Sequence, residues 1–319
     1  TYLFYAFALS WHFILVGVLL QSLFLVYQPA MAAMTADSIP PEQRGMGFST
    51  IMFLNNIASV FSPAIAGILL IQFGLVSSLR IGYLWVAGFY LMAAVVRIKL
   101  KETLRTSSSR ISIANAVAEY PKAVKEGLAV WKVLPRSMFF VFVTNALSSF
   151  TFAMFYPYLV VYATKILGIE EFHWAILMMW LSGCTLISAL PFGKLSDIIG
   201  RKKPFVISWV FLALFPLLFL IGNLQALFAG FLLFGLSNSL FVSTYQALEA
   251  DLVPQELRGK EVGCNQFMTY LLMAIGGLIG GFLYQYVSQA LPFMLAFLAS
   301  VACTVISLFL IHEPKERQK

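Results

Sequence analysis

Long apolar stretches constrain this sequence most, since each spans about 20 residues and only short polar segments separate them. Of the 319 residues, 60% are apolar and 11% are charged, whereas soluble domains carry about 25% charged residues. A backbone inside lipid must satisfy its own hydrogen bonds, so only helices and closed barrels span membranes. The stretches do not alternate, which excludes a barrel. The sequence predicts an all-α integral membrane protein.

The apolar stretches predict nine complete transmembrane helices, preceded by an apolar stub at Tyr2 to Ser10. The predicted helices cover residues 12–35, 47–72, 80–98, 138–164, 172–192, 204–222, 225–247, 263–287 and 290–311.

The net charge of +7 reflects loop residues rather than a nucleic-acid surface. All Lys and Arg residues except Arg80 and Lys165 fall in loops or ends on one side of the predicted helices. Such a bias marks the cytoplasmic side of a membrane protein. We therefore expect a multi-pass protein of the plasma membrane with a cytoplasmic C-terminus, the lipid bilayer as its surroundings and no nucleic-acid partner.

A long polar segment divides the predicted helices into two groups. We expect residues 1–98 to form the remainder of an N-terminal half, 99–137 a cytoplasmic linker, and 138–319 a six-helix C-terminal half. Apolar residues recur in the linker at three- and four-residue spacing, from Ile113 to Trp131. This pattern predicts a helix on the membrane surface, with a helix that binds a partner protein as the alternative.

An internal repeat relates the two groups of helices. Residues 36–45 and 250–259 share four positions, 214 residues apart. The shared pairs are Asp37 and Asp251, Pro40 and Pro254, Arg44 and Arg258, and Gly45 and Gly259. Both copies follow an inward-running helix, so the repeat is parallel and predicts two pseudo-symmetric halves, an arrangement typical of transporters.

A second motif lies at residues 193–203 and reads Gly-Lys-Leu-Ser-Asp-Ile-Ile-Gly-Arg-Lys-Lys. We expect Gly193 and Gly200 to permit a tight turn. Asp197 is expected near a helix N-terminus, and Arg201 is expected to pair with a carboxylate. Lys202 and Lys203 are interpreted as topology signals.

This motif closely resembles the G-x-L-x-D-x-x-G-R-[KR]-[KR] signature of the major facilitator superfamily, in the copy that joins helices 8 and 9. The two repeated loops resemble the family's connections between helices 4 and 5 and between helices 10 and 11. The resemblance covers essentially the whole chain. It implies the family's bundle of two halves, and it implies that the sequence begins late in family helix 3.

The resemblance also implies a gating role for the loop residues. Asp197 would approach the start of helix 5, and Arg201 would pair with Glu249 or Asp251. The full gating set expected from the motifs is Gly193, Asp197, Gly200, Arg201, Asp37, Arg44, Glu249, Asp251 and Arg258.

Small residues in two helices resemble the family's exporter motif, G-x8-G-x3-G-P-x2-G-G. They are expected to pack helices closely, and generic packing is the alternative to an exporter signature. The positions are Ser62, Pro63, Ala66 and Gly67, and at the repeat distance Gly276, Gly277, Gly280 and Gly281.

No ionisable residue lies in the middle of a predicted helix, so the sequence shows no carrier for a coupling ion. Uncharged polar residues are the candidates for a substrate cavity, with hydrogen bonding between helices as the alternative role. The candidates are Gln21, Gln28, Asn145, Tyr156, Asn238 and Tyr245. This lining favours a neutral or amphipathic organic solute.

These features and the resemblance together predict a secondary transporter working by alternating access, with a proton-coupled exporter of small organic solutes as the first hypothesis. A sugar or nutrient importer or uniporter, and a non-transporting partner protein or remnant, remain alternatives. His12, His173 and His312 lie too far apart in sequence to suggest a metal or catalytic site. We therefore expect neither an enzyme, a metal site nor a cofactor.

Overall fold

The structure is a computed structural model that describes residues 1–24, 44–98, 125, 127 and 129–312. Side chains at 44–56, 58, 59, 197, 250, 255, 256 and 258 are outside this description. The chain forms two compact units, residues 1–110 and 111–319, and we describe each separately. The predicted linker helix lies mostly outside the described residues.

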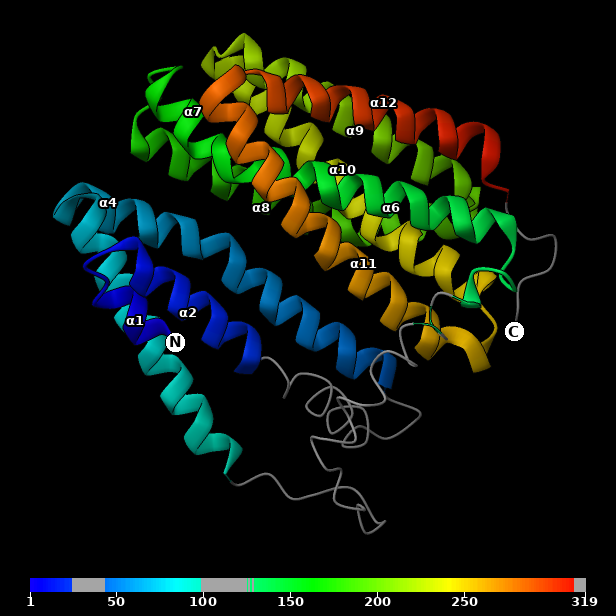
Figure 1. The fold of residues 1–319 in the computed structure, drawn as a ribbon, viewed down its shortest axis with the longest axis horizontal. Coiled ribbons are helices and arrows are strands. Elements are labelled where there is room, and N and C mark those ends of the chain that lie inside the picture. Colours follow the sequence, from blue (N-terminus) through cyan, green and yellow to red (C-terminus); the bar gives the residue numbers. More distant parts are fainter. Residues whose placement is uncertain (25–43, 99–124, 126, 128, 313–319) are drawn as a thin grey trace. The chain divides into compact units, whose positions relative to one another are not determined.

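The first unit contains α1 (Tyr2–Ala6), α2 (Trp11–Phe24) and α4 (Arg44–Arg97). Helix α4 is two helices joined at Gly74, whose φ of 69° and ψ of 172° break the helical path. The chain reverses there (Figure 1). Ser78 Oγ closes the turn, 2.7 Å from the Leu69 oxygen and 2.6 Å from the Gly74 oxygen. The two arms agree with the helices predicted at 47–72 and 80–98.

The second unit is a bundle of six transmembrane segments (Figure 1). Its first segment is α6 (Arg136–Phe155), a 3-10 turn η3 (Tyr156–Tyr158) and α7 (Leu159–Lys165). The others are α8 (Glu171–Ile199), α9 (Lys202–Ile221), α10 (Leu224–Leu252), α11 (Gln255–Phe282) with the π-helical turn η4 (Leu283–Val287), and α12 (Leu291–Leu310).

Seven helices among the described residues are long and apolar enough to cross a membrane. Counting the two arms of α4 separately and adding the shorter α2, the described part holds nine membrane-type helices and the α1 stub. The chain is therefore a multi-pass helical membrane protein, as its apolar stretches predict.

Several helices of the second unit are longer than predicted. Helix α8 runs to Ile199 instead of 192, since it continues past Pro191 and ends only at Gly200, which has a φ of 91°. Helix α11 begins at Gln255 instead of 263, directly after Pro254, since Pro is favoured next to a helix N-terminus. Polar residues that the sequence assigns to loops therefore lie on helices.

Glycines let α11 lie directly on α6. A Cβ atom added at Gly276 would overlap the carbonyl oxygen of Phe150, and one added at Gly280 would overlap that of Met154. The four-residue spacing places both glycines on one face of α11, as in close helix pairs in lipid. By contrast, Gly277 has its nearest neighbour, the Ala153 oxygen, 4.0 Å from an added Cβ.

Candidate functional site

The second unit encloses a cavity of about 290 Å³ between α6, α8, α9, α10, α11 and α12. Its lining is aromatic and uncharged polar, with no Asp, Glu, Lys, Arg or His among the lining residues. The aromatic members are Phe152, Phe155, Tyr156, Trp209, Phe234 and Phe241. The main polar members are Asn145, Ser148, Ser149, Thr151, Ser208, Ser237, Asn238 and Ser300.

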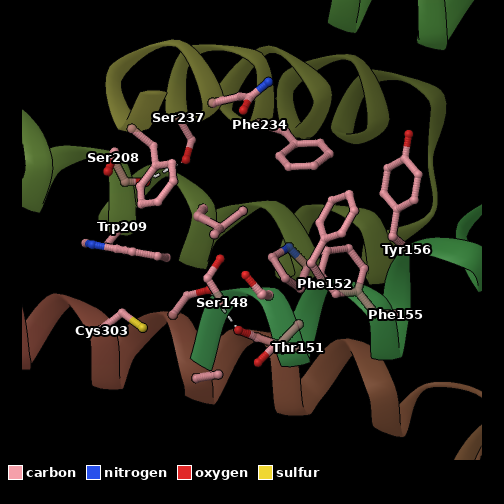
Figure 2. A pocket seen from close by; sticks show the side chains of 18 of the residues that line it. Ser148, Thr151, Phe152, Phe155, Tyr156, Ser208, Trp209, Phe234, Ser237 and Cys303 are labelled. Carbon is pink, nitrogen blue, oxygen red and sulfur yellow. Dashed lines mark hydrogen bonds between the residues drawn. The ribbon is translucent and has the colours of Figure 1, made fainter. Parts of the chain in front are cut away.

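Four aromatic rings gather at one end of the cavity, whereas Trp209 lies at the other end with the hydroxyl groups (Figure 2). Figure 2 shows the rings of Phe152, Phe155, Tyr156 and Phe234 together at one end, with the Ser148, Ser208 and Ser237 hydroxyls towards the other. Phe152 stacks on Tyr156 with 4.3 Å between ring centroids and meets Phe155 edge-on at 5.8 Å. The cavity thus offers an aromatic surface at one end and both hydroxyl groups and an aromatic ring at the other.

Most hydroxyl groups of the lining are already hydrogen-bonded to backbone oxygens. Ser149 donates to Asn145 O at 2.8 Å and Thr151 to Leu147 O at 2.6 Å. Ser208, Ser237 and Ser300 donate in the same way, at 2.7 to 2.8 Å. Each hydroxyl has a single hydrogen, so these groups cannot also donate to a solute.

The structure brings three of the predicted cavity residues to the cavity wall: Asn145, Tyr156 and Asn238. Tyr245 is not in the lining, but its hydroxyl accepts a hydrogen bond from Asn265 Nδ2 at 2.5 Å. Gln21 lies in the first unit, where its side chain accepts from the Tyr5 hydroxyl at 3.0 Å. Gln28 is outside the described residues.

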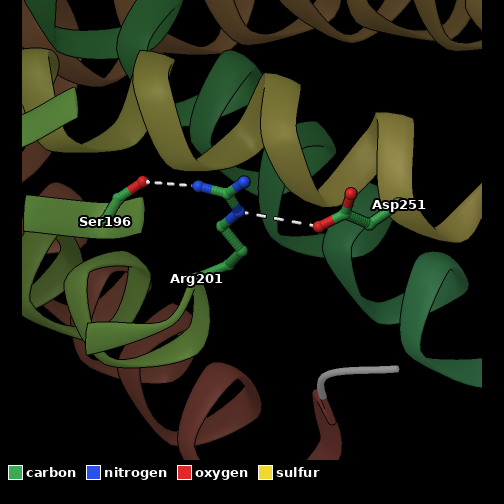
Figure 3. A network of polar contacts seen from close by, with 3 residues as sticks. All are labelled: Ser196, Arg201 and Asp251. Atoms are coloured by element: carbon green, nitrogen blue, oxygen red, sulfur yellow. Dashed lines mark hydrogen bonds and ion pairs between the residues drawn. The ribbon is translucent and has the colours of Figure 1, made fainter. Parts of the chain in front are cut away.

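A second polar cluster lies where α8 and α10 end and α9 and α11 begin. We call it the charged end and define it as Ser196, Arg201, Glu249, Asp251 and Glu261. Arg201 Nε lies 3.5 Å from Asp251 Oδ2, and Arg201 Nη1 donates to Ser196 Oγ at 3.1 Å (Figure 3). The Arg201 and Asp251 side chains are only 16% and 15% exposed, so the ion pair is poorly screened by solvent.

The turn between α8 and α9 explains how this pair forms. Gly200 has a positive φ, which reverses the chain and places Arg201 as the residue before α9. The structure thus joins Arg201 to Asp251, one of its two expected partners. Gly193, expected in a turn, is instead helical within α8, because the helix continues past it.

The other residues of the predicted gating set are only partly described. Asp37 lies outside the described residues. Asp197 lies in the last turns of α8, and Arg44 and Arg258 lie at or near the starts of α4 and α11, but none of these three side chains is described.

The small residues of the packing motif lie on two helices. Ser62, Pro63, Ala66 and Gly67 belong to the first arm of α4, with Pro63 inside the helix. Gly276 and Gly280 form the close approach of α11 to α6. Gly281 lies near the Tyr158 hydroxyl, 2.9 Å from an added Cβ, so the glycines of α11 differ in how much room they leave.

Glu261 is a further residue of the charged end that the predicted helix bounds leave out. The predicted helix starts at 263, whereas Glu261 lies in the second turn of α11 and is 0% exposed. The spacing of Glu261, Asn265 and Thr269 carries the signal that could have revealed it. Residues four apart share a helix face, so a helix that starts at Pro254 places these three polar side chains in one row.

Comparisons with known proteins agree with this architecture. The family described as Major Facilitator Superfamily matches residues 1–179 and 138–319. A segment of 127 residues is 32% identical to the MFS-type transporter gkaD of Penicillium citrinum, covering 37% of this chain and 20% of that protein. A segment of 128 residues is 28% identical to the quinolone resistance protein NorA of Staphylococcus aureus, covering 40% of this chain and 33% of NorA. The matched segments thus span a third or less of these relatives.

Two solved structures share the fold. A bacterial homologue of the iron transporter ferroportin, in an inward-facing state, superposes with a TM-score of 0.65 at 16% identity, over 86% of this chain and 65% of that one. A POT family transporter in complex with 5-aminolevulinic acid gives a TM-score of 0.69 at 12% identity, over 96% and 77%. At these identities, the likeness concerns the fold alone.

Proposed function

Because this chain belongs to the major facilitator superfamily, we propose that it is part of a secondary transporter that exports small neutral or amphipathic organic solutes in exchange for protons. The observation that carries this proposal is the cavity of the second unit, which combines aromatic rings with a few free polar groups and no charge. Pockets of this kind bind organic molecules by apolar contact, with a few polar groups fixing their orientation.

The free polar groups of the cavity are few. Among the described residues, Ser148, Asn238 and the Tyr156 hydroxyl form no hydrogen bond to the rest of the chain and line the cavity. A sugar needs many directional donors and acceptors, because each of its hydroxyls loses water on binding. The hydroxyls bound to backbone oxygens therefore support an amphipathic solute over a sugar. The resistance function named for NorA is consistent with such a solute.

The charged end supports a role in alternating access. The Arg201 and Asp251 ion pair links the α8–α9 turn, which carries the signature motif, to the end of α10. Since a poorly exposed ion pair favours the arrangement in which it forms, we assign this pair to the stabilisation of one access state. The signature residues around it have the same proposed role.

The orientation of the protein follows from its charges. The charged end carries Lys194, Lys202, Lys203 and Lys260 beside the cluster itself, and basic residues accumulate on the cytoplasmic side. We assign this end, and the C-terminus, to the cytoplasmic side of the plasma membrane.

Transport by the intact protein in proteoliposomes tests the proposal. A neutral amphipathic fluorescent probe is loaded, a proton gradient is imposed, and probe movement is followed with and without a protonophore. We expect uphill probe movement that the protonophore abolishes. A sugar-type substrate that competes with the probe, or probe movement unaffected by the gradient, would contradict the proposed exporter.

A further inference from the structure

Glu261 is the one charged residue in the described part of the chain that is fully buried. Among the described residues, no N–H group donates to either of its carboxylate oxygens, and the carboxyl group of Glu249 lies within reach of it. An ionised carboxylate that is buried without a partner costs several kcal/mol, roughly, relative to one in water. A fully buried carboxyl group beside a second carboxyl group is therefore more stable when the two share a proton.

Among the described side chains, those that act most strongly on Glu261 carry no positive charge. Glu249 and Tyr245, one turn apart on α10, are the titratable groups that act in its neighbourhood. On α6, which packs along α11, Arg136 is the only charged residue, and it is exposed in the first turn. Lys125 and Lys132 are exposed, and Arg258, three residues before Glu261 on α11, has a side chain outside the described residues.

Two neighbouring carboxyl groups in a poorly hydrated place resist carrying two negative charges at once. Glu249 is half-buried, whereas Glu261 is inaccessible. The pair can therefore exchange one proton with water through the Glu249 side, while Glu261 keeps that proton away from the solvent.

A chain of hydrogen bonds leads to the cavity from Tyr245, which lies within electrostatic reach of Glu249 and Glu261. Asn265 Nδ2 donates to the Tyr245 hydroxyl, and Asn145 Nδ2 donates to Asn265 Oδ1 at 3.1 Å. Asn145 Nδ2 also donates to Thr269 Oγ1 at 3.3 Å. Asn145 lines the cavity, so three side chains lead from the acidic pair to the place proposed for the solute.

We propose that Glu261 and Glu249 form a proton-binding site that is coupled to the cavity through Tyr245, Asn265 and Asn145. This inference rests on the proposed function for its link to transport. The hydroxyl oxygen of Tyr245 accepts a hydrogen bond from Asn265. The hydroxyl hydrogen of Tyr245 can therefore reorient when the charge on the acidic pair changes. A proton taken from water forms one O–H bond on the acidic pair and removes one negative charge. The change reaches Asn145 through Asn265, and release of the proton to water reverses it.

Infrared difference spectroscopy of the intact protein in lipid tests the site without measuring transport. A protonated carboxyl group has a C=O stretching band that an ionised one lacks. We expect a pH-dependent band of this kind in the wild type and its loss in Glu261→Gln. Glu171→Gln, at an exposed position in the first turn of α8, is the matched control and should retain the band. Glu249→Gln should change the pH at which the band disappears, because it removes the neighbouring carboxyl group.

A band that persists unchanged in Glu261→Gln overturns the proposal. The proposal is also overturned if the folded wild type shows no such band at any pH, and this result does not depend on the folding of any variant.

Transport measurements then separate the proton-binding site from the proposed exporter function. Export in Glu261→Gln should no longer depend on the imposed proton gradient, whereas Glu171→Gln should behave as wild type. Gradient-driven export that is unchanged in Glu261→Gln overturns the coupling site and leaves the exporter standing. A Glu261 band in a protein without gradient-driven export supports the site and contradicts the exporter.

Discussion

The cavity and the charged end of the second unit differ in how they satisfy their polar groups. In the cavity, most hydroxyls bond to the backbone of their own helix, with Ser237 as the exception, so the wall is largely closed to further hydrogen bonding. At the charged end, polar groups bond between different segments, as Arg201 does with Asp251. Bonds within a helix survive when helices move, whereas bonds between helices depend on their relative position.

This difference assigns separate tasks to the two regions. The cavity can keep its shape and its mixed aromatic and polar surface while the half moves as a body. The charged end can exist in more than one arrangement, since an ion pair or a proton changes its energy. Helix α11 belongs to both regions, because Glu261 lies in its second turn and its glycines pack against α6, which lines the cavity.

The largest effect is expected from separating α11 and α6. In Gly276→Val, the new side chain meets the Phe150 backbone, which cannot move as a side chain can. We expect a loss of about 3 kcal/mol in stability, at the upper end for overpacked cores, measured as a lower unfolding temperature in detergent. Gly277→Ala is the control and should unfold close to wild type. Equal unfolding temperatures for both variants would show that the close approach of the helices is not needed.

Next in size is the loss of the ion pair at the charged end. Arg201→Gln leaves Asp251 poorly exposed without its cation, and we expect about 2 kcal/mol of destabilisation, within the range for charged hydrogen bonds. Lys203→Gln, at an exposed position of the same motif, is the control.

A double-mutant cycle with Asp251→Asn isolates the pair itself. The double variant should lose less stability than the sum of the losses in the two single variants. Each single variant leaves one charged partner unpaired, whereas the double variant removes both charges. Strictly additive losses in thermal unfolding would mean that the two side chains do not stabilise each other.

A smaller effect follows from giving the cavity a charge. Asn145→Asp keeps the side-chain size but places a carboxylate on the wall. We expect neutral probes to bind about tenfold more weakly, equivalent to about 1.4 kcal/mol, and cationic probes to gain relative to them. Asn223→Asp is the matched control, since Asn223 is exposed and its side chain accepts from Ala226 N at the start of α10, which an aspartate does equally well. Unchanged preference in Asn145→Asp would place the solute elsewhere.

The smallest effects distinguish two tyrosines. Tyr156→Phe removes a free hydroxyl from the cavity, whereas Tyr245→Phe removes the acceptor for Asn265. We expect each change to cost about 1 kcal/mol or less, but in different measurements. Tyr156→Phe should weaken probe binding without altering its pH dependence, and Tyr245→Phe should alter the pH dependence of binding. The opposite assignment, or the same response from both, would contradict the division between the two regions.

The sequence alone predicts the helices well, because apolar stretches of membrane length leave few alternatives. It also predicts that Arg201 pairs with a carboxylate and that Asn145, Tyr156 and Asn238 belong to the cavity candidates. It fails at helix ends, since the polar residues between Pro254 and Gly263 are compatible with both a loop and a helix. For that reason Glu261 was overlooked.

The state of the cavity hydroxyls also escapes sequence reasoning. A serine inside an apolar helix can face a solute or bond to the carbonyl three or four residues earlier. Only the rotamers decide between these roles, as Ser149 and Ser208 illustrate. The repeat and the signature motif likewise indicate two halves, but Asp37 and the side chain of Asp197 lie outside the part of the chain that the structure describes.

Photo-crosslinking with a neutral amphipathic probe tests most directly whether the solute occupies the cavity. The intact protein is labelled in proteoliposomes, and the modified residues are identified by mass spectrometry. We predict labels on α6, η3 and α10, at cavity residues such as Phe152, Tyr156 and Asn238, with labelling reduced by an excess of unlabelled probe. Competed labelling concentrated around Arg201 at the charged end, with none at the cavity residues, would contradict this account.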